Sequence, residues 1–139
     1  MDHKNKKNIP TMIPYLTVCN AKESINFYEK AFGFTWLNAA EADENGDIQH
    51  VEISYKDVLI MFAPEGACED LTTKAPITTG TRSPMSLYLY CDDIETLYQQ
   101  SIKAGAKSLR EPFDAFWGDR VFQVSDLNGY EWMFAKSLN

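Results

Sequence analysis

The sequence predicts an α+β fold made of two consecutive β-α-β-β-β units. The tripeptide Met-Phe-Ala occurs at residues 61–63 and again at 133–135, and these copies are 72 positions apart in a chain of 139 residues. Before each copy, a short apolar segment leads into an amphipathic helical pattern, and segments typical of strands follow that helix. Two copies of one folding unit explain both observations.

The first unit is expected over residues 12–63. Its apolar segment MIPYLTVC is followed by Asn20 and, three residues later, by Glu23, which is the spacing of a helix-capping box. Apolar residues then recur at helical spacing until Gly33, a common helix stop. The segments TWLNAAEA, IQHVEISY and VLIMFA are expected as strands, and the turn DENGD contains the Asn-Gly pair favoured in hairpins.

Residues 85–136 repeat this order as a second unit. MSLYLYC is expected as a strand, Asp92 with Glu95 as the cap of the next helix, and Gly105 as its end. The segments KSLREPF, DRVFQVSD and YEWMFAK supply three more strands. Residues 64–84, rich in Thr, Pro and Gly, are expected as a linker, and residues 1–11 as a flexible tail. One domain is expected overall, with a curved, barrel-like mixed sheet around a cavity.

The composition limits the classes of partner and location. There are 13 Lys and Arg residues against 20 Asp and Glu, so the net charge is −7, which disfavours nucleic acid and anionic membranes and attracts cations. No apolar run approaches the roughly 18 residues of a membrane span, and no signal-peptide pattern follows the basic start. The three cysteines include no C-x-x-C pair. A cytoplasmic location is therefore expected.

The doubled unit, with INFYEKAFGF in its first helix, resembles the vicinal oxygen chelate superfamily, which includes glyoxalase I, extradiol dioxygenases and bleomycin-resistance proteins. Three segments are similar to its PhnB-like branch, namely IPYLTV, HVEISYKDVLIMF and FWGDRVFQVSDLNGYEWMFA. The resemblance runs from about Ile13 to Lys136 and implies one glyoxalase-like domain. It also implies a homodimer, with the cavity either within one chain or shared between two.

The resemblance further implies four metal-ligand positions on the first and last strands of the units. Family enzymes place His, Gln or Glu there, but in this chain the positions fall on Ile13, Met61, Ser86 (or Met85) and Met133. None of these supplies an imidazole or a carboxylate, and a thioether is a poor ligand for hard or borderline divalent ions. Neither a metal nor another cofactor is therefore expected.

His50 and Glu52 are the candidates for catalysis. They are two residues apart on an expected strand, so their side chains point to one face. Such a pair could supply two metal ligands, or an acid and a base. A hydrogen-bonded strand histidine beside an acidic neighbour also explains the pattern without any chemistry.

Aromatic residues predict a small-molecule site at the rim of the cavity. Phe113, Phe116 and Trp117 crowd the stretch PFDAFWGDR, in which Asp119 and Arg120 open the next strand. Rim aromatics hold planar ligands, and an acidic neighbour favours positive charge. A structural alternative is that Trp117 closes the end of the sheet and the charged pair contacts its neighbours.

Tyrosine and methionine residues complete the expected pocket. By alternation, Tyr15 and Tyr88 share the face of Ile13 and Ser86, so they are expected to enter the cavity. Met61 and Met133 are expected to form the cavity floor. The pocket is thus predicted to be aromatic, with few charges.

Three hypotheses of function follow. The first is a metal-free protein that sequesters a small molecule, such as a cationic aromatic compound or antibiotic, as the resemblance to bleomycin-resistance proteins implies. The second is a glyoxalase-like or PhnB-like enzyme, a lyase, isomerase or dioxygenase, with a non-standard metal or acid–base site. The third is an interaction module with an empty cleft. The identity of the ligand is not encoded in any motif.

Overall fold

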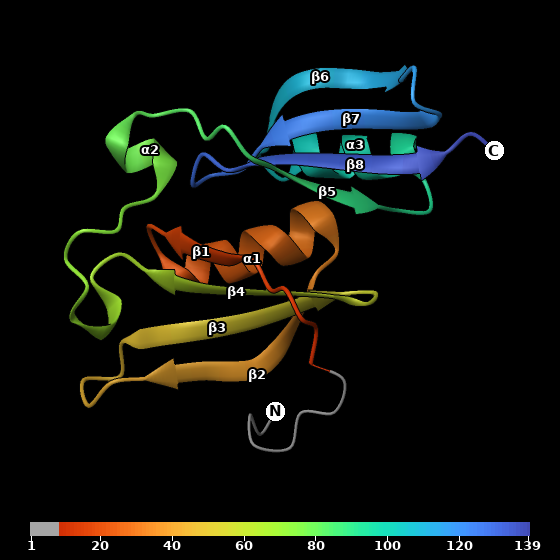
Figure 1. Cartoon of the computed structure of the whole chain (residues 1–139). Coiled ribbons are helices and arrows are strands. Elements are labelled where there is room, and N and C mark those ends of the chain that lie inside the picture. The colour runs from red at the N-terminus through yellow and green to blue at the C-terminus, as the bar shows by residue number, and fades with distance from the viewer. Residues whose placement is uncertain (1–8) are drawn as a thin grey trace. The chain divides into compact units, whose positions relative to one another are not determined.

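The computed structural model describes residues 9–139, apart from the side chains of residues 38–41. Most of the expected tail, residues 1–8, therefore lies outside the described part. The chain divides into a first compact unit that runs to Glu29 and includes Gly33–Ala75, and a second that contains Lys30–Phe32 and Pro76–Asn139. Each unit holds its own curved, open four-stranded sheet (Figure 1). The predicted α+β class and the tandem arrangement are confirmed.

The first unit has the expected order of elements. These are β1 (Tyr15–Val18), α1 (Ala21–Phe32), β2 (Thr35–Ala42), β3 (Ile48–Tyr55), β4 (Val58–Pro64) and the short helix η2 (Ala67–Glu69). The sheet order is β1-β4-β3-β2. The β1–β4 pair is parallel, whereas β4–β3 and β3–β2 are antiparallel, so the sheet is mixed.

The second unit repeats that topology. It contains α2 (Pro76–Thr79), β5 (Ser86–Tyr90), α3 (Ile94–Lys103), β6 (Lys107–Asp114), β7 (Asp119–Ser125) and β8 (Glu131–Ser137). The sheet order is β5-β8-β7-β6, and β5–β8 is again the parallel pair. The segment expected as a linker thus contains two short helices, η2 and α2. No helix in residues 9–139 is long and apolar enough to cross a membrane.

Strand alternation gives each sheet one apolar face. In the first unit these buried side chains are Leu16, Val18, Val51, Ile53, Ile60 and Phe62, and Tyr28 of α1 contacts the ring of Phe62 at 5.7 Å. In the second unit they are Leu89, Phe122, Val124, Trp132 and Phe134. Helix α3 lies against this second face (Figure 1). Each such large side chain contributes about 1.5–3 kcal/mol to the stability of its unit when fully buried, so each apolar face stabilises the unit to which it belongs.

The spacing of the repeat differs between its early and late elements. Tyr15 pairs with Met61 as Tyr88 pairs with Met133, so the first strands are 73 positions apart while the last strands are 72 apart. The same shift moves the second helix cap. Asp93, and not Asp92, is the N-cap of α3, and it accepts a hydrogen bond from the Thr96 backbone N–H at 3.1 Å. The prediction of Asp92 is wrong because the helix start, like the first strand, is displaced by 73 residues, so Asp93 takes the position of Asn20.

Replacement of Asp93 by Ala is expected to lower the midpoint of thermal unfolding by about 2–5 °C, because the first turn of α3 loses its side-chain acceptor. Asp93→Asn is the matched control, since an amide oxygen can accept the same hydrogen bond and should preserve most of the stability. Differential scanning calorimetry of the three proteins makes the comparison. Equal melting temperatures for Asp93→Ala and the wild type would show that this cap does not stabilise the fold.

Candidate functional site

The face of the second sheet opposite its apolar core carries several predicted site residues. Strand register places Tyr88, Met133 and Gln123 side by side across β5, β8 and β7, and it places Tyr90 beside Ala135. Residues paired in this way share one face, and alternation sends their sequence neighbours to the core. Tyr88 and Met133 therefore lie on the same face, as the sequence predicted.

At one end of this face, Asp119 accepts hydrogen bonds from two tyrosines. The hydroxyl of Tyr88 donates to Asp119 Oδ2 at 2.5 Å, and that of Tyr90 donates to the same oxygen at 2.7 Å. The indole Nε1–H of Trp117 in turn donates to the Tyr88 hydroxyl oxygen at 2.9 Å. Asp119 is buried, while all three aromatic side chains keep substantial exposure. The result is a buried carboxylate bound by the hydroxyls of two tyrosines whose side chains remain partly exposed.

The hydrogen bonds fix the charge state of this cluster. Those from Tyr88 and Tyr90 hold the pKa of Asp119 below its usual range, although burial acts in the opposite direction. Burial, followed by the hydrogen bond to Asp119, raises the pKa of Tyr88 to about 12. At neutral pH the cluster therefore contains one carboxylate and neutral phenols, which places a single negative charge behind the rings.

Phe116 and Trp117 extend the aromatic surface from the turn between β6 and β7. Gly118 makes this turn with φ 97°, and its N–H donates to the Ala115 carbonyl at 3.1 Å. The two rings meet edge to face with centroids 5.1 Å apart, and Phe116 is 97% exposed. A ring so exposed has most of its surface available to a ligand or partner.

Of the predicted ligand-binding residues, Phe113 lies in a strand of the site face and Arg120 lies on the other side of the sheet. Phe113 is part of β6, not of the turn, and it packs against Ala115, Val121 and Ala135. Arg120 points to the opposite, helix-covered side, since its guanidinium donates to Glu95 of α3 at 2.6 Å and to Asp114 at 2.9 Å. Strand register therefore puts Phe113 on the site face, across β7 and β8 from Tyr90. Arg120 is removed from it, because its direct neighbour Asp119 occupies the site face.

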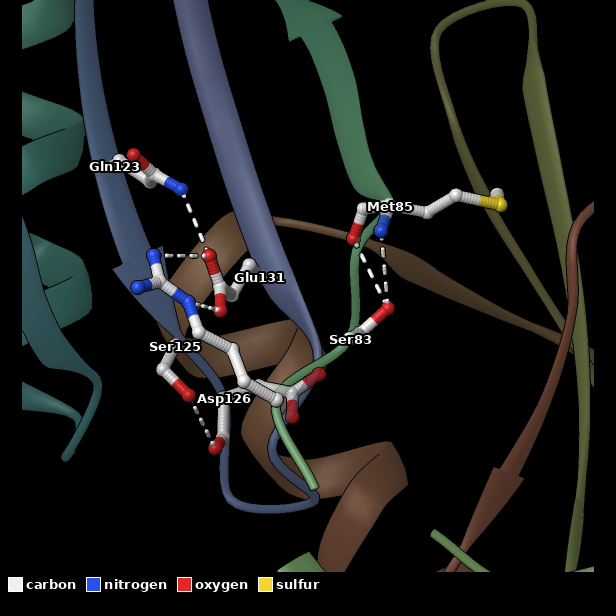
Figure 2. Close-up of polar contacts among 7 residues, drawn as sticks. Ser83, Met85, Gln123, Ser125, Asp126 and Glu131 are labelled. Carbon is white, nitrogen blue, oxygen red and sulfur yellow. Dashed lines mark hydrogen bonds and ion pairs between the residues drawn. The ribbon is translucent and has the colours of Figure 1, made fainter. Parts of the chain in front are cut away.

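A second carboxylate, Glu131, lies on this face, and no sequence pattern indicates it as a site residue. Arg82 binds it through two hydrogen bonds, Nε to Oε2 at 2.6 Å and Nη2 to Oε1 at 3.0 Å. Gln123 Nε2 also donates to Oε1 at 2.9 Å (Figure 2). Arg82 and Glu131 are 49 positions apart, so no local pattern joins them. Tyr90, by contrast, follows from simple alternation with Tyr88.

The corresponding face of the first unit carries the two catalytic candidates. Tyr15, Met61 and Glu52 lie side by side across β1, β4 and β3. His50 bridges this row, with Nε2 lying 3.0 Å from Glu52 Oε2 and Nδ1 lying 2.9 Å from the Tyr15 hydroxyl. The sequence predicted that His50 and Glu52 share a face, and the structure adds Tyr15 to them.

A cleft in the first unit lies away from these residues. It is an open cleft of about 1120 Å³ at the end where β1 stops and α1 begins, and its walls include Cys19, Lys22, Gly66 and the turn at residues 43–49. Asp43, Asp47, Glu65 and Glu69 make it acidic. None of the predicted ligand-binding residues lines this cleft.

Comparison with known proteins identifies the family. Residues 9–134 match the family model described as the Glyoxalase/Bleomycin resistance protein/Dioxygenase superfamily. The chain belongs to this superfamily. Uncharacterized proteins from Mycobacterium bovis and Mycobacterium tuberculosis are each 27% identical to it over 131 residues, or 93% of this chain. The match covers 84% of the M. bovis protein and 75% of the M. tuberculosis protein.

Solved structures of low sequence identity share the fold. The crystal structure of TioX from Micromonospora sp. ML1 has a TM-score of 0.72 and 22% identity, and the match covers 93% of this chain and 99% of TioX. The fosfomycin resistance protein FosX from Mesorhizobium loti has a TM-score of 0.66 and 12% identity, with 92% of each chain covered. At this level of identity the likeness establishes the fold alone.

The metal site implied by the superfamily does not fit the residues of this chain. The 73-residue spacing makes Ser86, not Met85, the equivalent of Ile13. The strand neighbour of Ser86 is Glu131, but both oxygens of that carboxylate bind the Arg82 guanidinium. Among the residues whose side chains are described, no group of three or more His, Cys, Asp or Glu is placed to hold a metal ion. We therefore derive no step through a metal.

Met61→Glu is expected to destabilise the protein far more than Met61→Gln at pH 7. The new carboxylate would lie beside buried Glu52 on the neighbouring strand, and bringing two like charges together out of water costs on the order of several kcal/mol. Urea denaturation of both variants measures the difference, which should shrink toward pH 5 as the carboxyl takes up a proton. Equal stability at pH 7, or micromolar zinc binding by Met61→Glu, would contradict this account.

Proposed function

We propose that this protein binds a planar, positively charged aromatic small molecule on the second unit and acts by sequestering it, without a metal. The observation that carries the proposal is the buried Asp119 carboxylate, which accepts hydrogen bonds from the hydroxyls of exposed Tyr88 and Tyr90, with exposed Trp117 bonded to the Tyr88 hydroxyl. A cationic ring stacked there would contact aromatic faces and lie close to a fixed negative charge. No bond needs to be made or broken for this function.

The individual forces favour a cation over a neutral ring. Ring–ring contact contributes about 0.5–1.5 kcal/mol beyond the apolar area covered, and this term is available to any aromatic ligand. A cation over exposed Trp or Tyr adds about 0.5–1 kcal/mol. The net charge of −7 attracts cations at longer range, with a screening length of about 8 Å at physiological salt. Binding should therefore weaken as salt rises.

The family supports an antibiotic as the class of ligand. Its description includes bleomycin resistance proteins, and FosX, which shares the fold, is a fosfomycin resistance protein. The mycobacterial relatives are uncharacterized and add no ligand. We therefore place resistance by sequestration first among the uses of such a site, in the manner that the likeness to the PhnB-like branch and to bleomycin-resistance proteins suggests.

Assembly and location form part of the same proposal. A homodimer in the cytoplasm rests on the family resemblance and on the charge and cysteine pattern of the sequence. Light scattering on the purified protein should give twice the chain mass of 15.8 kDa. A monomeric mass would remove the dimer from the proposal while leaving the site within the second unit unchanged.

Trp117→Ala is expected to weaken binding of an aromatic cation by about tenfold, which corresponds to about 1.4 kcal/mol, because it removes the ring that closes over the cluster. Calorimetric titration with N-methylquinolinium and with bleomycin measures the loss. Trp117→Phe is the matched control, since it keeps a ring and should retain most of the affinity. Unchanged affinity in Trp117→Ala would place the site elsewhere.

Asp119→Asn separates the contribution of charge from that of ring contact. The amide oxygen can still accept from Tyr88 and Tyr90, so the aromatic surface should persist while the negative charge is lost. N-methylquinolinium should bind more weakly to this variant, whereas neutral quinoline should bind equally to both proteins. Because hydrogen bonds hold the pKa of Asp119 low, wild-type affinity for the cation should stay constant from pH 7 to pH 5 as far as this group is concerned.

Two results would refute the charge argument or the metal-free mode of action. A parallel loss of quinoline and N-methylquinolinium binding in Asp119→Asn would show that the variant disrupts the surface and that charge is not selected. Stoichiometric zinc, nickel, iron or manganese in protein purified without added metal would favour a metal-dependent enzyme instead.

A further inference from the structure

We propose that the first unit carries an acid–base site, in which Tyr15, His50 and Glu52 exchange a proton with a small, uncharged hydroxyketone. This activity is independent of the cation site on the second unit. The three side chains form one hydrogen-bonded row that leads from the interior to the surface, and a small cavity adjoins its outer end.

Exposure increases along the row. Glu52 is fully buried, His50 has a side chain that is 20% exposed, and Tyr15 is 55% exposed. Strand register places Leu37 and Met61 on either side of Glu52, so the carboxylate lies among apolar groups. Burial of an acid in such surroundings is costly unless a donor accompanies it, and the imidazole supplies one.

The hydrogen bonds give the row a direction. Because an ionised carboxylate only accepts hydrogen bonds, we assign the ring hydrogen to His50 Nε2, which lies 3.0 Å from Glu52 Oε2. The other ring nitrogen, Nδ1, then has a lone pair and accepts from the Tyr15 hydroxyl at 2.9 Å. Glu52 thus orients the imidazole, and the imidazole is ready to take the phenolic proton.

The cavity at the outer end limits the substrate. It has a volume of about 160 Å³ and is bounded by Tyr15, Thr17, Cys68, Asp70 and Thr73. Since one water molecule takes about 30 Å³ in the liquid, this space holds about five waters, or a molecule of about five heavy atoms. Hydrogen bonds from the side chain of Thr73 and the backbone N–H of Thr72 keep the pKa of Asp70 well below its usual range. A negative rim disfavours anions, and the hydroxyls of Tyr15, Thr17 and Thr73 on the walls suit an uncharged, polar compound.

The step is a proton transfer that conserves charge. A C–H bond next to the carbonyl of the substrate breaks, and its proton passes to Tyr15 Oη while the Tyr15 proton moves to His50 Nδ1. The substrate is left as an enolate, and the imidazolium is stabilised by Glu52. Tyr15 then donates a proton to the former carbonyl carbon and recovers one from His50 Nδ1, while the hydroxyl proton of the substrate passes to the neighbouring oxygen. The product is the isomerised ketone or aldehyde, and no oxidant or metal is consumed.

Hydrogen–deuterium exchange tests the proposal without knowledge of the natural substrate. In D₂O, wild-type protein should exchange the carbon-bound hydrogens of hydroxyacetone and dihydroxyacetone faster than buffer does, as seen by proton NMR. Tyr15→Phe and His50→Gln should each lose about 100-fold of that rate, which is the usual contribution of a positioned acid or base. Tyr98→Phe removes a hydroxyl of the second unit that donates to Ser108 Oγ at 2.8 Å, and this variant should exchange like the wild type.

Ring nitrogen NMR of His50 separates positioning from folding. Wild-type His50 should show the Nε2–H tautomer, and Glu52→Gln should change the tautomer balance and slow exchange while the protein stays folded. Exchange no faster than buffer with both ketones, exchange by Tyr15→Phe at the wild-type rate, or a dominant Nδ1–H tautomer would each overturn the proposal. Cation binding by the second unit would be unaffected by any of these outcomes.

Discussion

The parallel pairing of the first and last strands of each unit is the constraint on which the other features depend. It sets Tyr15 beside Met61 in one unit and Tyr88 beside Met133 in the other. Because strand side chains alternate with a period of two, this register decides which residues form the apolar core and which lie on the opposite face. A slip by one residue would exchange the two sets and place Trp132 and Phe134 in water.

On this common frame the two units have different chemistry. In the first, a row of Tyr, Met and Glu is bridged by a histidine that joins a buried carboxylate to an exposed phenol. In the second, Gln123 occupies the place of Glu52 in the row, and the carboxylate lies instead at Asp119, near the turn that carries Trp117. We propose on this basis that one unit serves proton transfer and that the other contacts a flat cation.

Much of the fold could be predicted from the sequence because its signals are local. The bounds of β2 and β3 match the segments TWLNAAEA and IQHVEISY, since alternation and the intervening turn define both ends. The faces of Tyr15, Tyr88, His50 and Glu52 follow from the same periodicity. The helix cap at Asp93 was harder to predict to the exact residue. Helix α3 is shorter than α1, so the spacing between equivalent residues of the two units changes within this segment.

Contacts between distant segments could not be predicted. Nothing near Glu131 in the sequence indicates that Arg82 binds it, and the partners of Arg120 come from α3 and from the end of β6. Phe113 is close in sequence to Trp117, but it lies within β6 rather than in the turn, and strand pairing sets it beside Val121 on the site face. These placements depend on which strands pair, and composition does not encode that.

The most direct test of the binding account is a titration of ¹⁵N-labelled protein with N-methylquinolinium, followed by amide and indole NMR signals. The account predicts that the Nε1–H of Trp117 and the amides of residues 88–90 and 116–119 shift together and saturate, while Trp36 and Trp132 stay unchanged. Shifts that gather instead around Cys19, Gly66 and Glu69 would locate the ligand in the acidic cleft of the first unit and contradict the proposed site.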